Sequence, residues 1–167
     1  MKRNIIACVA SLAAIVLVAP KVHAVIAELQ TANGTLKIVQ EPEIVATEDA
    51  TFVDMPGMTT TIKTKNNGLL SIRFGSQVFC SDGAANGCSG FVQILVDDVV
   101  VPPAEVAPFV NQPGDIGALS LAIDRAVGGL TKGTHTVKVQ IRSSASDQFS
   151  LLNSQLTVQA FKGSAPL

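Results

Sequence analysis

Short runs in which apolar and polar side chains alternate constrain this sequence more than any other feature. In the clearest run, 134–142, His135 and three aliphatic residues alternate with polar or charged ones. Similar runs lie at 69–74, 119–124 and 155–160. A period of two residues is that of a β-strand with one face in a core and the other in water. These runs therefore predict strands, and no segment has a convincing helical period.

Turn-forming residues separate these runs. Asn67-Gly68 lies between two strand-like runs and predicts a hairpin, and Asn153-Ser154 predicts a turn. Pro102-Pro103 ends a strand that begins at Val92, and the Pro- and Gly-rich residues 102–117 predict a long crossover between sheets. Further strands are expected at 26–31, 35–40, 43–46, 59–65 and 148–152. So many short strands predict an all-β fold: a single-domain, antiparallel, jelly-roll-like β-sandwich.

The N-terminus has the three parts of a secretory signal peptide. Lys2 and Arg3 precede an uncharged, mostly apolar run over 5–19, and Val22-His23-Ala24 ends in small or apolar residues. The apolar run is too short for a permanent membrane span. We therefore expect residues 1–24 to be cleaved and the protein to be secreted, to the exterior, the cell surface or a periplasm. An uncleaved anchor is the alternative.

The mature chain, 25–167, has the length of one domain. We divide it into N-terminal strands at 25–58 and a jelly-roll core at 59–161. Three of the twelve basic residues lie in the signal peptide, so the net charge changes from −1 to −4. A mildly acidic chain without a basic cluster is not expected to bind nucleic acid. No later segment is apolar enough to predict a membrane span.

Two cysteines, Cys80 and Cys88, remain after signal cleavage. An even cysteine count in an exported protein predicts a disulfide. The residues between them include Asp82-Gly83 and Asn86-Gly87, which favour turns. We expect the bond to close the base of a loop between two strands that pair with each other. Two cysteines without a nearby histidine do not predict a zinc site.

Several segments carry a resemblance to a known family. They are 70–76, Cys80 and Cys88, 92–98 with Pro102, 130–140 and 156–158. From 59 to 161 the chain resembles a family of small secreted bacterial proteins of uncharacterised function, with a jelly-roll-like sandwich. That family usually has glycine at the position of Asp98, so the turn there is expected to differ. The strand order is also similar to the trimeric jelly rolls of the complement and tumour-necrosis-factor type, which implies a fold but no activity.

The mature chain lacks the usual signs of an enzyme. His135 is its single histidine, and no G-x-S-x-G motif accompanies it. We expect His135 to be structural. Asp97 and Asp98 are adjacent, so on a strand they point to opposite faces, and a turn or strand end is expected there. We predict no catalytic residues, no cofactor and no metal.

Ligand binding is the alternative to a purely structural role. A calcium site using Asp82, Asp97, Asp98 or Asp115 is one form of it. A glycan site is another, although the chain has neither Trp nor Tyr to stack on a sugar ring. The first expectation is a structural or interaction module of the cell surface or envelope with an unknown extracellular ligand. An enzyme of unrecognised type is the third.

Four apolar residues fall on the polar side of their strands: Leu69, Phe91, Leu95 and Phe161. Exposed apolar residues that lie together usually mark an interface. Either the segment 25–58 folds over this face, or identical subunits cover it. Jelly rolls of this type commonly form trimers, so we predict a homo-oligomer.

Overall fold

The structure, a computed structural model, describes residues 25–31, 34–80, 88–103, 108–112, 118–144 and 148–161. The predicted signal peptide, 1–24, lies outside this range. In the described part of the chain, no helix is long and apolar enough to cross a membrane.

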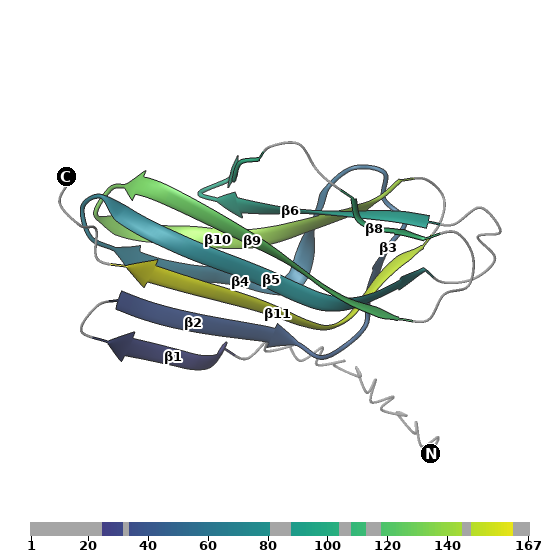
Figure 1. Cartoon of the computed structure of the whole chain (residues 1–167), viewed down its shortest axis with the longest axis horizontal. Coiled ribbons are helices and arrows are strands. Elements are labelled where there is room, and N and C mark those ends of the chain that lie inside the picture. The colour runs from purple at the N-terminus through teal and green to yellow at the C-terminus, as the bar shows by residue number, and fades with distance from the viewer. Residues whose placement is uncertain are drawn as a thin grey trace, which may run out of the picture.

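The described residues form antiparallel strands (Figure 1). They are β1 (Val25–Thr31), β2 (Gly34–Glu41), β3 (Val45–Thr47), β4 (Val53–Thr64), β5 (Gly68–Cys80), β6 (Cys88–Val96), β7 (Val99–Val100), β8 (Pro108–Gln112), β9 (Leu119–Leu130), β10 (Gly133–Ser143) and β11 (Phe149–Phe161). Most lie within a few residues of the strands that the alternating runs predict.

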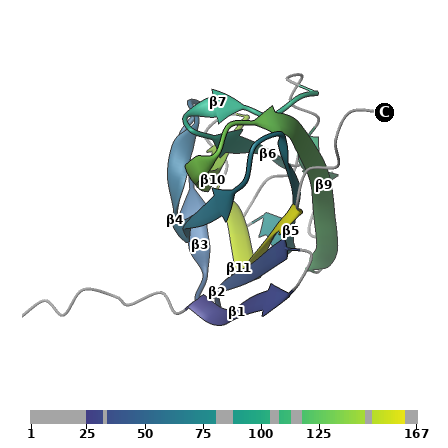
Figure 2. The same ribbon diagram turned by 90° about the vertical axis from the view of Figure 1, so that its left-hand side faces the viewer.

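Two sheets pack face to face, as the end-on view shows (Figure 2). Sheet A has the order β1-β2-β11-β5-β9, with β3 also paired to β11, and sheet B has the order β4-β10-β6-β7, with β8 also paired to β6. The pairs β2 with β11, β4 with β10, β5 with β9 and β6 with β7 are nested within one another along the chain. This is the connectivity of a jelly roll, so the predicted fold class is confirmed.

The core lies between the sheets and follows the period-two pattern. Along β10, Val137, Val139 and Ile141 are buried while the residues between them are partly exposed. The largest fully buried side chains come from both sheets and include Phe74 and Phe149. The alternation in 134–142 therefore identified both the strand and the face that it buries.

Two predicted turns have different roles in the structure. Asn67 has a positive φ of 53° and turns the chain after β4, but β4 and β5 belong to different sheets, so the predicted hairpin is wrong. Asn153, also with a φ of 53°, lies inside the continuous strand β11. The pairing of β11 with β5 shifts register between Leu152 and Gln155, so Asn153 marks a β-bulge and not a turn between strands.

The strand that begins before Val92 ends at Val96, earlier than expected. Asp97 and Asp98 have φ values of 51° and 65°, as in the two-residue turns that close hairpins, and the chain returns as β7. The predicted turn is therefore present. Within 102–117, β8 pairs with β6 in sheet B, so this part of the expected crossover is a strand.

The two cysteines lie at strand ends in different sheets. Cys80 ends β5 in sheet A and Cys88 begins β6 in sheet B, so the expectation that the flanking strands pair is wrong. The cysteine side chains and residues 81–87 lie outside what the structure describes, and the disulfide stays a prediction. If formed, it would link the two sheets instead of closing a hairpin.

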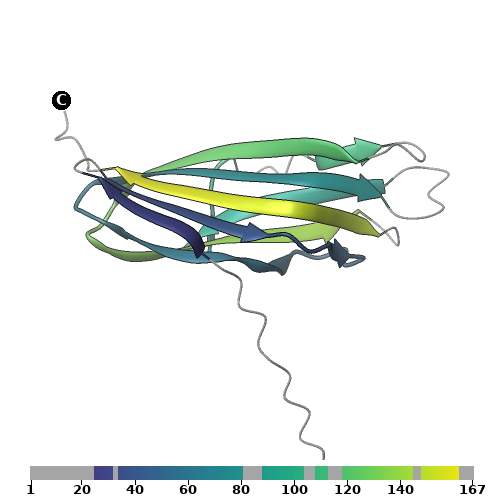
Figure 3. The same ribbon diagram turned by 90° about the horizontal axis from the view of Figure 1, so that it is seen from below.

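The N-terminal segment 25–58 does not lie over the outer face of either sheet. Its strands β1, β2 and β3 belong to sheet A, and β4 begins within it and belongs to sheet B. Figure 3 shows β1 and β2 beside β11 as members of one layer. Cover by this segment is therefore excluded for the described residues.

Candidate functional site

The four predicted interface residues lie on opposite sides of the sandwich. Leu69 and Phe161 are cross-strand partners on the outer face of sheet A. Phe91 and Leu95 lie on the outer face of sheet B, opposite Arg142 and Lys138. The structure therefore does not bring the four residues together, because β5 and β11 belong to one sheet and β6 to the other.

On sheet A, Leu69 and Phe161 have apolar neighbours. Leu36 of β2 lies on the outer face, opposite Leu29 of β1 on one side and Gln159 of β11 on the other. It is therefore a diagonal neighbour of Phe161, which is two residues from Gln159 on β11. Leu29 is 55% exposed and Leu69 is 40% exposed. We call this surface the apolar patch: Leu29, Leu36, Ile38, Leu69 and Phe161. Sequence reasoning missed Leu36 and Ile38 because it did not determine which side of 35–40 faces outward, and it missed Leu29 because it did not place 26–31 beside that strand.

On sheet B, Phe91 and Leu95 are not freely exposed. The Arg142 guanidinium lies 3.8 Å from the centre of the Phe91 ring, in a cation–π contact. Leu95 is only 5% exposed, because it is flanked by Lys138 on β10 and Val100 on β7. Leu95 lies on the outer face as expected, but the expectation that it is exposed there is wrong.

The polar side chains on the outer face of sheet B are bonded to one another. Gln93 donates to Gln140 at 2.6 Å, and Gln140 donates to Asp54 at 2.6 Å. Lys138 bridges Asp54 at 3.2 Å and Asp98 at 2.8 Å. The hydrogen bond from Gln140 lowers the pKa of Asp54. These side chains therefore satisfy much of their hydrogen-bonding capacity without a partner molecule.

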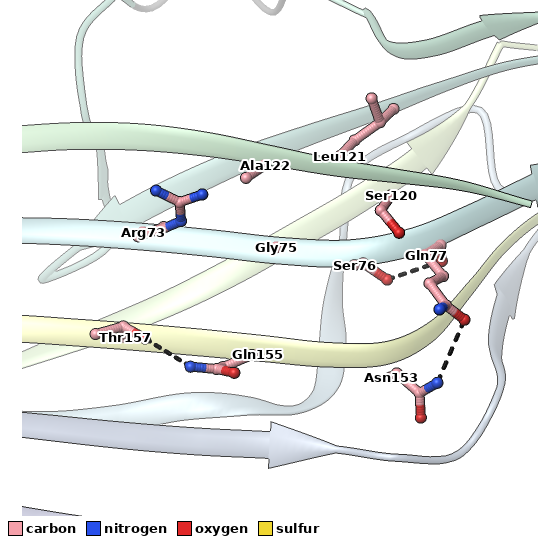
Figure 4. A pocket seen from close by; sticks show the side chains of 10 residues that line it. All are labelled: Arg73, Gly75, Ser76, Gln77, Ser120, Leu121, Ala122, Asn153, Gln155 and Thr157. Atoms are coloured by element: carbon pink, nitrogen blue, oxygen red, sulfur yellow. Dashed lines mark hydrogen bonds between the residues drawn. The ribbon is translucent and has the colours of Figure 1, made fainter.

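A depression lies on the outer face of sheet A, around Gly75 (Figure 4). It has a volume of about 560 Å³. Its lining comes from β5, β9 and β11: Arg73, Gly75, Ser76, Gln77, Ser120, Leu121, Ala122, Asn153, Gln155 and Thr157. We call it the Gly75 depression. It exists because Gly75 and its cross-strand partner Ala122 leave the middle of the face without large side chains.

Hydrogen bonds orient the amides around this depression. The Asn153 side chain donates to the side-chain Oε1 of Gln77 at 3.3 Å, and Gln155 donates to the Thr157 hydroxyl at 3.1 Å. On the buried side, the Ser76 and Ser154 hydroxyls lie 2.9 Å apart. The depression therefore has a polar rim that is partly held in place before any ligand binds.

His135 is placed at the end of the core, where two turns meet. It is 6% exposed; its Nδ1 lies 2.6 Å from Asp97 Oδ2, and its Nε2 lies 3.0 Å from the Thr131 carbonyl oxygen. Both partners are acceptors, so two hydrogen bonds require both ring nitrogens to be protonated. The hydrogen bond with Asp97 raises the pKa of His135 and lowers that of Asp97. This fits the predicted structural role.

The two adjacent aspartates do not act together. Asp97 contacts His135 and accepts a bond from the Thr136 amide at 2.8 Å, whereas Asp98 pairs with Lys138. In the part of the chain that the structure describes, no group of three or more His, Cys, Asp or Glu side chains could hold a metal ion. Asp82 and Asp115, the other calcium candidates, lie outside that part.

Comparisons with known proteins bear on the fold alone. No protein-family model matches the sequence, and no curated protein matches it. Eiger, a TNF protein from S. frugiperda, is 14% identical over 74% of this chain and 89% of its own, with a TM-score of 0.39. The VP2 subviral particle protein of infectious bursal disease virus is 12% identical over 74% of this chain and 32% of its own, with a TM-score of 0.47.

These likenesses are distant. The expected similarity to jelly rolls of the tumour-necrosis-factor type is found at this level, and the resemblance to secreted bacterial proteins stays a prediction. The class that the structure itself defines is a jelly-roll β-sandwich with one outer face closed by internal polar contacts. The other outer face carries an apolar patch and a polar depression.

Proposed function

We propose that this protein is an exported interaction module of the cell surface or envelope that self-associates through the outer face of sheet A. The apolar patch is the observation that carries the proposal. On the solvent face of an antiparallel sheet the outward side chains are normally polar. Exposed leucines on such a face, Leu29 on β1 and Leu69 on β5, with Leu36 and Phe161 on the strands between them, favour an interface with another protein surface.

The size of the face supports a second copy of this chain as the partner. The face is five strands wide, with about 4.8 Å between neighbouring strands, and it is as long as β5, whose 13 residues rise about 3.3 Å each. It therefore spans roughly 800 Å². That is about the area each partner buries in a standard stable interface. The outer face of sheet B, with its polar groups bonded internally, is the poorer candidate. From the jelly-roll architecture we expect a trimer.

Light scattering on the exported protein tests this proposal. We expect a mass above that of the monomer at micromolar concentration, and Leu69→Lys should lower it to the monomer mass without unfolding the domain. Val99→Lys is the matched control, since Val99 is an apolar residue on β7 of sheet B that is 68% exposed. A monomer mass for the unmodified protein, unchanged on dilution, would reject self-association. Equal effects of the two variants would reject the patch.

A further inference from the structure

The Gly75 depression has the chemistry of a binding site that is separate from the apolar patch. Gly75 lies six residues along β5 from Leu69, which corresponds to about 20 Å in an extended strand. We infer that the depression binds a neutral, hydroxyl-rich ligand: an oligosaccharide. The two surfaces share one face, so a second copy that covered the whole face would compete with the ligand, and sugar binding is expected of the dissociated protein.

The shape of the depression comes from residues far apart in the sequence. Gly75 and Ala122 supply the low centre, and the β-bulge at Asn153 brings its amide to Gln77 on the neighbouring strand. Figure 4 shows Arg73, Gln77 and Gln155 around that centre. The volume of about 560 Å³ falls within the usual range for small-ligand sites.

The lining side chains favour a polyol over an ion. Each amide has two N–H donors and an oxygen that can accept twice. The bonds from Asn153 to Gln77, from Gln155 to Thr157 and from Gln40 to Gln155 therefore leave a donor or an acceptor site on each amide for the hydroxyls of a sugar ring. Among the described residues of the lining, Arg73 alone is charged, and its guanidinium lies 3.8 Å from an Asp124 carboxylate oxygen, which offsets its charge. The rim is therefore nearly neutral, which favours a neutral ligand over an anion.

The affinity is expected to be low. The protein has no Trp or Tyr, so no large polar ring can stack on a sugar face, and binding depends mainly on hydrogen bonds. Each such bond contributes little once the exchange with water is counted. A dissociation constant on the order of 1 mM is the expected scale.

Nuclear magnetic resonance titration of the exported protein tests the inference with cellobiose, maltose and N,N′-diacetylchitobiose as probes. At least one of them should shift the side-chain amide signals of Gln77, Asn153 and Gln155 together. Gly75→Leu should weaken that response about tenfold or more. A Cβ at Gly75 would meet no atom closer than 3.5 Å, so the variant should fold.

A second pair of variants controls for folding and for the face. Ala122→Lys fills the same depression from β9, and Ala126→Lys places the same charge outside its lining on the same exposed side of the strand. The first should abolish the sugar response, and the second should leave it unchanged. Leu69→Lys, which frees the face, should keep or strengthen the response, so failure of self-association and failure of sugar binding are separate results.

Several results would overturn the inference. One is no shift of the three amide signals with any of the three sugars. Another is a response that survives both Gly75→Leu and Ala122→Lys. A response limited to digalacturonate and lost in Arg73→Gln would show an anion site instead.

Discussion

The contact between His135 and Asp97 leads to a prediction about stability and pH. His135→Gln removes an imidazolium held between the Asp97 carboxylate and the Thr131 carbonyl oxygen. Hydrogen bonds to charged groups contribute about 1.5–3 kcal/mol each. Because the Asp97 side chain is half exposed, solvent screens the pair, and we discount the total loss to about 1–2 kcal/mol.

The sign of the pH dependence follows from the direction of the two pKa shifts. The folded-state pKa of His135 is raised above 6.5, so its stabilisation is complete below 6.5 and is lost as pH rises through the folded pKa. The pKa of Asp97 is lowered below 3.8, so its contribution is present above 3.8 and is lost as pH falls through the folded pKa. The pair therefore contributes most between these two values.

Urea unfolding of the unmodified protein and of His135→Gln at pH 5.5 and pH 9 measures this effect. The difference in unfolding free energy should be larger at pH 5.5. Asp97→Asn should remove most of the pH dependence, because it removes the charge that favours the imidazolium. A difference that is equal at both pH values, or larger at pH 9, would show that His135 is neutral in the folded protein.

Two further predictions concern the packing between the sheets. A Cβ at Gly90 would overlap the ring of the buried Phe149, so Gly90→Ala should destabilise the domain by about 2 kcal/mol or more. Gly133→Ala is the control: no atom lies within 4 Å of its new Cβ, so it should change the unfolding free energy by less than about 0.5 kcal/mol. Equal unfolding free energies for the two variants would contradict this packing. Non-reducing peptide mapping should find Cys80 bonded to Cys88, and Cys80→Ser should cost about 2–3 kcal/mol. Free-thiol labelling of both cysteines in the exported protein would remove the disulfide.

Local features of the sequence determined the strands and most turn positions. The alternation in 134–142 predicts β10 and its buried face, because side chains in a strand point to opposite sides whatever the partner strand is. Asn67 and the pair Asp97-Asp98 mark turns because Asn and Asp tolerate a positive φ. These properties depend only on residues close together in the chain, so they can be read without a structure.

Which strands pair was decided only by the tertiary structure. Asn67 predicts a turn but not whether the chain returns in the same sheet or crosses to the other, and here it crosses. The alternation in 35–40 could place Leu36 and Ile38 inside; pairing with β11 instead puts Val39 in the core and the other two in the apolar patch. The Gly75 depression likewise depends on contacts of β5 with both β9 and β11. Strand pairing joins segments distant in sequence, and a period of two residues carries no information about the partner.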